Sequence, residues 1–304
     1  VIMPTVGRHN ICALQGVSKD LRFPDGRDNH EPDKMYFLSG FFYVIGEAKL
    51  DLLKDNLKKL YFRFLIPSLG SAMVMSIYTL TDAIVIGQGV GANALAALSI
   101  TTPLLCILMS TGILFGVGGS VQMSVQRGTR KYDKANRFFS LSFFTIIAVT
   151  IVLWLVYGFG ISTVLRLMGA NDTLYPYAMS YMIYIIIFLP VAVLSNYIAI
   201  FVRADEDPNR AMFGVLLGGA TNIVLDIAFV FPLQMGIGGA ALASVLGMVI
   251  QVIVGVSHFF SRKNQLKFIK PKHVFSSIGQ IVGNGIPSFF NEFANGFSVL
   301  LFNI

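Results

Sequence analysis

Two aspartates stand alone inside long apolar runs of this 304-residue sequence. Asp82 is the only charged residue in the run 64–87, and Asp226 is the only one in the run 211–231. A carboxylate in hydrocarbon costs about 2.5 to 3.5 kcal/mol on insertion scales, so such a residue usually faces a cavity, a partner or an ion path. We predict that both side chains bind a cation or a proton. The alternative is that each only caps or hydrogen-bonds a neighbouring helix.

The two aspartates also have matched neighbours and matched depth. Each lies five residues before the end of its run, which is about 7 to 8 Å along a helix. Tyr78 precedes Asp82 by four residues and Asn222 precedes Asp226 by four, so each pair shares a helical face. Further oxygen donors are expected at a similar level from Tyr181, Tyr184 and Ser244.

This donor set predicts one ion-coupling site. Carboxylate, amide and hydroxyl oxygens suit Na⁺, and a buried carboxyl group is equally suited to bind a proton. The choice between H⁺ and Na⁺ stays open. The neutral members have an alternative role as hydrogen-bonding contacts between helices; they are Tyr78, Tyr181, Tyr184, Asn222 and Ser244.

Membrane-spanning helices are the elements that must carry these residues. The chain is 55% hydrophobic and only 13% charged, which is not a soluble composition. A helix of about 20 apolar residues crosses the roughly 30 Å core of a bilayer. We predict an all-α polytopic membrane protein with seven spans, at residues 64–87, 94–126, 138–165, 174–202, 211–231, 236–260 and 274–304.

Lys and Arg residues alternate between the loops that connect these spans. They gather before the first span and after the second, fourth and sixth, whereas the other loops hold only Arg166. Cytoplasmic loops hold the excess of Lys and Arg, so the amino terminus and residues 262–272 are predicted to be cytoplasmic. The net charge of +7 then sets topology and does not indicate nucleic-acid binding. This orientation also opposes a seven-helix receptor, which needs an external amino terminus.

The remaining residue types exclude several chemistries. Two cysteines, Cys12 and Cys106, are too few for a disulfide framework, and the four histidines show no metal-ligand spacing. No nucleophile–base pair or phosphate-binding loop is present. We therefore predict that the protein is not an enzyme and needs no cofactor beyond its coupling ion.

The chain divides into three predicted parts. Residues 1–50 form a polar tail, disordered or foreign; residues 51–261 form a six-helix lobe; and residues 262–304 form a basic linker and the first helix of a second, truncated lobe. The tripeptide Ile66-Pro67-Ser68 recurs as Ile286-Pro287-Ser288, each time after a basic segment, as a duplicated lobe requires. Residues 51–63 are predicted either to lie along the membrane surface or to be a simple basic flank.

Prolines, glycines and a third carboxylate complete the set of candidates. Pro67 is predicted to act as a hinge that moves Asp82, and Pro190 to kink the fourth span. Glu292 lies about 15 Å nearer the cytoplasm than a counterpart of Asp82 would, and its role stays open. Close helix packing, with a hinge as the alternative, is predicted at the small-residue stretches 112–120, 214–219 and 236–239.

An ordered series of motifs over residues 55–304 resembles the multidrug and toxic compound extrusion (MATE) family. The series consists of Ile66-Pro67-Ser68, Thr81-Asp82-Ala83-Ile84-Val85-Ile86-Gly87, the turn at 89–99, Phe201-Val202-Arg203-Ala204 with Asp207-Pro208, Asn222-Ile223-Val224-Leu225-Asp226, and the segment from Gly236 to Ser244. The first 50 residues have no counterpart in the family, and nearly all of a second lobe is missing.

The resemblance implies a two-lobe, twelve-helix secondary antiporter in a bacterial inner membrane. It would export drugs, organic cations and other amphiphiles in exchange for H⁺ or Na⁺, with Asp82, Asn222, Asp226 and Ser244 as coupling residues and Pro67 as the bending proline. A tyrosine of the fourth span takes part, either Tyr181 or Tyr184. The alternative is a flippase of lipid-linked oligosaccharides or polysaccharides from the same superfamily, which would be expected to place basic residues in its cavity.

Overall fold

The computed structural model describes residues 57–271 and 274–302, and every regular element within them is helical. The predicted all-α class is confirmed. The polar tail at 1–50 lies outside the described residues. The elements are α2 (Leu57–Gly89), α3 (Ala92–Gly128), α4 (Tyr132–Leu167), α5 (Tyr175–Ile187), α6 (Leu189–Ala204), α7 (Pro208–Val230), α8 (Gly236–Val256), the 3₁₀ turn η2 (Ser257–Phe260) and α9 (Val274–Phe302).

Five helices are long and apolar enough to cross a membrane, and the pair α5 and α6 makes a sixth span with a bend of 61°. The five are α2 from Phe64 onward, α3, α4, α7, and α8 together with η2. The seventh predicted span forms as α9, but among the described residues it does not reach the same hydropathy. Gln, Asn, Glu and several Ser and Gly residues dilute its apolar content. The six spans agree with the predicted six-helix lobe, and a membrane crossing by the seventh helix stays a prediction.

The break in the fourth span follows from Pro190, as predicted. Proline has no N–H, so the carbonyl of Ile186, four residues earlier, loses its helical donor. The indole Nε1 of Trp154 donates to this oxygen at 2.8 Å. The only tryptophan of the chain thus satisfies the backbone group that the kink exposes, because a free carbonyl inside a membrane is costly.

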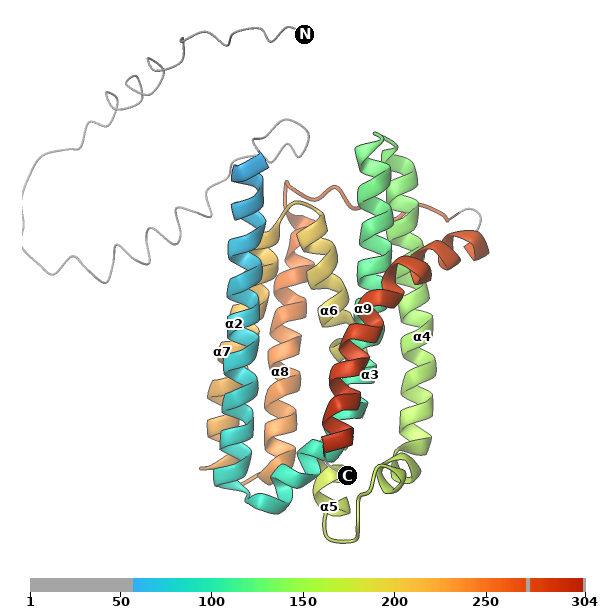
Figure 1. Cartoon of the computed structure of the whole chain (residues 1–304). Coiled ribbons are helices and arrows are strands. Elements are labelled where there is room, and N and C mark those ends of the chain that lie inside the picture. The colour runs from blue at the N-terminus through green and yellow to red at the C-terminus, as the bar shows by residue number, and fades with distance from the viewer. Residues whose placement is uncertain (1–56, 272–273, 303–304) are drawn as a thin grey trace, which may run out of the picture. The chain divides into compact units, whose positions relative to one another are not determined.

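The first span does not break at its proline. α2 continues from Leu57 to Gly89 with Pro67 inside it, and Figure 1 shows one uninterrupted helix. Residues 57–63 belong to this helix, which favours a basic flank over a separate surface helix; residues 51–56 lie outside the described part. The hinge at Pro67 stays a prediction.

Close contacts at glycines hold α9 against α3. A side chain at Gly118 would collide with the carbonyl oxygen of Ile281, and one at Gly285 would collide with that of Leu114. The two backbones therefore cross with only hydrogen atoms between them. Figure 1 shows α9 lying across α3 after a first part that runs in another direction. That α9 begins a second lobe stays a prediction.

The chain between η2 and α9 is attached to α4. The N–H of Lys267 donates to Asn136 Oδ1 at 3.2 Å, and the N–H of Ile269 donates to Ser140 Oγ at 2.8 Å. Between them, Phe268 packs on Phe139 with ring centroids 5.1 Å apart. The predicted basic linker therefore lies along the start of α4. The start of α4 and the chain that follows α8 therefore lie at the same end of the helices.

Candidate functional site

A cavity of about 320 Å³ lies among α2, α3, α5, α6, α7 and α8. Asp82 lines it together with polar side chains from all five of the other helices. The structure thus brings together residues that are up to 176 positions apart in the sequence, from Met75 to Gln251. The predicted site residues that line the cavity are Tyr78, Asp82, Tyr181, Asn222 and Ser244.

Glycines allow the helices that carry these residues to approach closely. A side chain at Gly218 of α7 would meet the carbonyl oxygen of Gly247 of α8 at 2.6 Å, and the reverse contact has the same distance. Gly219 similarly faces Val74 of α2 at 2.9 Å and Tyr78 at 3.5 Å. Close packing is thus confirmed as a function of these glycines. Gly236 differs, because nothing lies near it and its φ of +63° suits the turn that starts α8.

Asp226 lies behind the wall of the cavity and is fully buried. It does not line the cavity itself, but its carboxyl group lies within hydrogen-bonding reach of Asp82. Within the described residues, neither oxygen of Asp226 accepts a hydrogen bond, and Oδ1 of Asp82 is also buried without a partner. Two carboxylates can bond to each other only when one carries a proton. A proton on one carboxyl group, or a cation between the two, would satisfy these oxygens.

The neutral members of the site are bonded to each other. The amide nitrogen of Asn222 donates to Ser244 Oγ at 3.1 Å, and the hydroxyl of Tyr181 is within reach of the same serine. Asn222 lies next to Asp226, but its donor points to Ser244. The amide oxygen of Asn222 is buried and, within the described part of the chain, has no partner. Asp82, Asp226 and Asn222 thus contribute free oxygens to one place.

The fourth span contributes Tyr181 and not Tyr184. Tyr181 is buried among the groups just described. Tyr184 instead packs against Gly238 at the start of α8, where a side-chain carbon added to the glycine would lie 2.9 Å from the tyrosine ring. Tyr184 does not line the cavity. Pro67 lies on α2, the helix that also contributes Tyr78 and Asp82 to the cavity wall, but Pro67 itself does not line the cavity.

Glu292 of α9 is close enough to act electrostatically on Tyr78 and Cys106, which both line the cavity. Glu292 was predicted to lie about 15 Å nearer the cytoplasm than a counterpart of Asp82 would. It nevertheless comes close to the cavity, because α9 crosses α3 and changes direction (Figure 1). The sequence identified Glu292 as a lone carboxylate. Only the path of α9 places it beside the cavity.

Comparison with known protein families decides the family. The MatE family model matches residues 67–228, which is more than half of the chain. The chain belongs to the MatE family. The matched region includes Asp82, Asn222 and Asp226, but not Ser244 or Glu292.

Relatives and solved structures of MatE proteins agree with this assignment. The multidrug export protein MepA of Staphylococcus aureus is 27% identical over 256 residues, which are 83% of this chain and 56% of MepA. A crystal structure of MATE in the straight conformation has a TM-score of 0.72 at 27% identity and covers 79% of this chain and 54% of the other. An outward-facing multidrug resistance MATE family transporter has a TM-score of 0.73 at 26% identity, with 81% and 56% covered. The chain spans about half the length of the curated relatives that it matches.

A second buried group of charges lies at the opposite end of α7 in this MatE chain. Asp205 is fully buried and forms an ion pair with Arg127 at 2.6 Å; it also contacts His258 Nε2 at 2.7 Å. The N–H of Gln265 donates to the same carboxylate at 3.0 Å. Arg127 ends α3 and His258 lies in η2. This group joins the end of α3, the turn between α6 and α7, and the chain after α8.

Asp207 extends this group. His258 Nδ1 lies 3.3 Å from its carboxylate, Arg210 Nε lies 3.1 Å away and Lys263 Nζ lies 3.9 Å away. Burial raises the pKa of Asp207, but the hydrogen bond from His258 and the charges of Lys263 and Arg210 lower it more, so the net pKa is below the ordinary value. Asp207 also precedes Pro208 at the start of α7, where a negative charge is favourable.

Within the described residues, no three His, Cys, Asp or Glu side chains are placed to hold a metal ion. A Na⁺ at the cavity would therefore use the mixed oxygens of Asp82, Asp226 and Asn222. The network around Asp205 is filled by nitrogen donors, so it offers no such place.

Proposed function

We propose that this chain is the ion-coupling half of a secondary antiporter that exports amphiphilic organic cations in exchange for H⁺ or Na⁺. The carboxyl pair Asp82 and Asp226 carries the proposal, because Asp226 is fully buried, Asp82 lines the cavity beside it, and three of their four oxygens have no hydrogen-bond partner within the described residues. The relative MepA is a multidrug export protein. Since the chain spans only part of their length, transport is proposed for the full-length protein.

The pair supplies a mechanism for coupling. Two like charges a few ångströms apart in a low-dielectric region repel strongly, whereas one shared proton or one Na⁺ removes the repulsion. Asp82 is on α2 and Asp226 is on α7. Binding of the ion therefore favours a closer packing of these two helices, and release favours a looser one. An ion that binds one packing better shifts the balance between two access states.

The cavity wall favours a cationic or amphiphilic substrate. The phenol rings of Tyr78 and Tyr181 can attract a cation by their faces, and Met75, Met109 and Met248 supply flexible apolar surface. Asp82 adds a negative charge that competes for the same cation. A substrate and the coupling ion would then exclude each other at Asp82, which is what an antiporter needs.

The lining argues against a flippase for lipid-linked sugars. Such a cargo carries phosphate groups, which are usually held by Lys or Arg. Within the described part of the chain, neither residue lines this cavity. We therefore favour the cation exporter.

The test uses the full-length protein in vesicles with a fluorescent organic cation, and with pH and Na⁺ gradients imposed separately. Asp82→Asn and Asp226→Asn keep size and hydrogen-bonding capacity but remove the charge. We expect each variant to lose gradient-driven export by roughly tenfold or more, the range of a lost charge-assisted contact. Asp172→Asn is the matched control, because its carboxylate is 93% exposed. Wild-type export in both site variants would refute the assignment.

Asn222→Ala should have a smaller effect, because it removes a neutral ligand and leaves both carboxylates in place.

We also propose a bacterial inner membrane with the amino terminus and residues 262–270 on the cytoplasmic side, as the positive-inside rule predicts. Single cysteines placed in 262–270 should resist an impermeant thiol reagent in intact cells. Labelling from outside without permeabilisation would contradict this orientation.

A further inference from the structure

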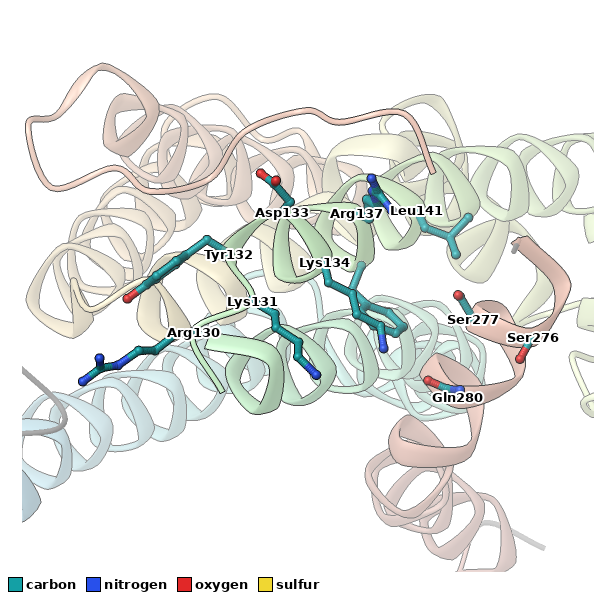
Figure 2. A pocket seen from close by; sticks show the side chains of 11 residues that line it. Arg130, Lys131, Tyr132, Asp133, Lys134, Arg137, Leu141, Ser276, Ser277 and Gln280 are labelled. Carbon is teal, nitrogen blue, oxygen red and sulfur yellow. The ribbon is translucent and has the colours of Figure 1, made fainter. Parts of the chain in front are cut away.

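A second cavity, of about 760 Å³, lies between the α3–α4 turn and the start of α9. Its wall contains four basic residues, and Asp133 is the only acidic residue that lines it in the described part of the chain. Figure 2 shows Lys131 and Lys134 pointing to the side of α4 where Ser277 and Gln280 of α9 lie. The basic lining residues are Arg130, Lys131, Lys134 and Arg137.

These cations have no acidic partner within the described residues. Among the described residues, none of the four forms an ion pair, although the nearby Arg127 does. The Nε of Arg137 is buried and has no partner in the described part of the chain. Arg130 has a φ of +60°, a conformation that favours glycine over a residue with a side chain. Four free cations around one cavity are suited to an anion.

The α9 side of the cavity adds neutral donors. Ser276, Ser277 and Gln280 line it from the first turns of this 29-residue helix. The N–H groups at the start of a helix have no helical acceptors, and the helix dipole favours negative charge there. Hydroxyl and amide donors with basic side chains are the usual ligands of phosphate oxygens.

The surroundings favour a lipid headgroup over a free phosphate ion. Two helices that contain membrane spans, α3 and α4, meet at this turn. The charged residues of the turn follow the apolar part of α3 and precede that of α4, so we place the cavity on the headgroup side of the apolar core. Tyr132, which lines the cavity, is 53% exposed; exposed tyrosine side chains gather at the membrane interface. Phe138 and Leu141 give the wall an apolar part. The volume suits a ligand larger than one ion.

We propose that this cavity binds the phosphate headgroup of an anionic membrane phospholipid, such as phosphatidylglycerol. Basic pockets between spans on the cytoplasmic side are suited to acidic headgroups. The phosphate would contact Lys131, Lys134 and Arg137 from one side and the donors of Ser277 and Gln280 from the other. The bound lipid would thereby connect α4 to the start of α9. This site is separate from the Asp82 cavity and does not depend on the transport proposal.

The experiment measures binding of fluorescent phosphatidylglycerol to the purified full-length protein in neutral detergent, with phosphatidylcholine carrying the same label for comparison. The pocket variant Lys131→Gln/Lys134→Gln/Arg137→Gln should bind phosphatidylglycerol roughly a hundredfold more weakly. The control Arg262→Gln/Lys267→Gln/Lys270→Gln removes equal charge from the neighbouring linker, where none of the three lines the cavity. It should change binding by less than about threefold, because charges that do not line the cavity are screened by water and salt.

A single substitution keeps the test decisive if the triple variant does not fold. Gln280 is exposed, so Gln280→Glu preserves shape and places a negative charge in the cavity; binding should weaken roughly fivefold. Gln88→Glu, in the last turn of α2 and outside the cavity lining, should leave the binding of phosphatidylglycerol unchanged. Equal loss in both triple variants, or equal binding of the two lipids, would overturn the proposal. Displacement by inorganic phosphate, but not by chloride at the same ionic strength, would show a free-anion site and overturn the lipid assignment.

Discussion

Asp82 and Asp226 form one pair of carboxylates, of which Asp226 is fully buried and Asp82 lines a cavity. Asp205 and Asp207 form a second, buried pair, about 28 Å away along α7. Around the second pair the structure places Arg127, Arg210, Lys263 and His258. Around the first pair, within the described residues, it places only neutral donors, and those are bonded to each other. The same side chain therefore has opposite electrostatic surroundings at the two ends of one helix.

The difference separates a structural charge from a titratable one. A carboxylate with several cations and an N–H donor is stable as an anion, and its removal leaves buried positive charge behind. A carboxylate pair without cations is costly in its charged form and gains from any proton or cation that enters. The comparison teaches that burial alone does not mark a functional acid. The absence of compensating donors does.

The largest predicted effect concerns Asp205→Asn. The variant leaves the Arg127 guanidinium without its counter-charge and His258 with Asp207 alone, and such broken buried pairs cost about 3 to 5 kcal/mol. We expect a large loss of thermal stability in detergent, measured by tryptophan fluorescence or by aggregation on heating. Asp172→Asn, at an exposed position, should melt as the wild type does. A melting curve for Asp205→Asn within error of the wild type would remove the structural half of the comparison.

Asp226→Asn should have the opposite profile. Because the carboxylate oxygens of Asp226 have no donor in the described part of the chain, neutralising them removes a cost, so the stability should be unchanged or higher. Ion-driven export should fall as proposed above. The measurement is the pair of values, melting temperature and transport rate, for one purified variant. A strongly destabilised but actively transporting Asp226→Asn would invert the comparison.

The positions of Asp82 and Asp226 could largely be predicted from the sequence. A lone acid inside an apolar run is a local signal, and so is Pro190, whose missing N–H breaks the fourth span. Helical spacing also related Asn222 to Asp226. These predictions needed only neighbours within one helix, which is why they agree with the structure.

The rest depends on contacts between distant segments. Tyr181 and Tyr184 are one turn apart, so helical spacing did not separate them; the position of Gly238 on α8 does. His258 was set aside for lack of ligand spacing, yet it contacts Asp205 and Asp207, more than 50 positions away. Sequence reasoning treated Arg127 only as a topogenic charge. The acids that follow the fourth span, Asp205 and Asp207, were the available signal, because acidic residues in a basic loop suggest ion pairs with residues of other loops.

The pH dependence of Asp207 is a smaller effect with a definite sign. Its pKa in the folded protein is lowered, because His258, Lys263 and Arg210 outweigh burial. A depressed carboxyl pKa contributes stability above the unfolded value of about 3.9, and this contribution is lost as pH falls through the folded pKa. The carboxylate of Asp207 also pairs with the protonated ring of His258, so Asp207→Asn should melt below the wild type by a gap that is largest near pH 5, where His258 is protonated. The difference should shrink below about pH 4. A gap that instead grows below about pH 4 would contradict the sign.

Glu292→Gln gives the smallest predicted effect and tests whether Glu292 belongs to the same titratable group as Asp82 and Asp226. Glu292 acts on Tyr78 and Cys106 at the edge of the cavity, but it is partly exposed and does not line the wall. If the unpaired pair alone couples the ion, Glu292→Gln should keep gradient-driven export and weaken the affinity for a cationic substrate by only a few-fold, as expected for a partly screened charge. Export at several substrate concentrations separates the two quantities. A loss of maximal rate as large as in Asp82→Asn would extend the titratable group to three carboxylates and place α9 within it.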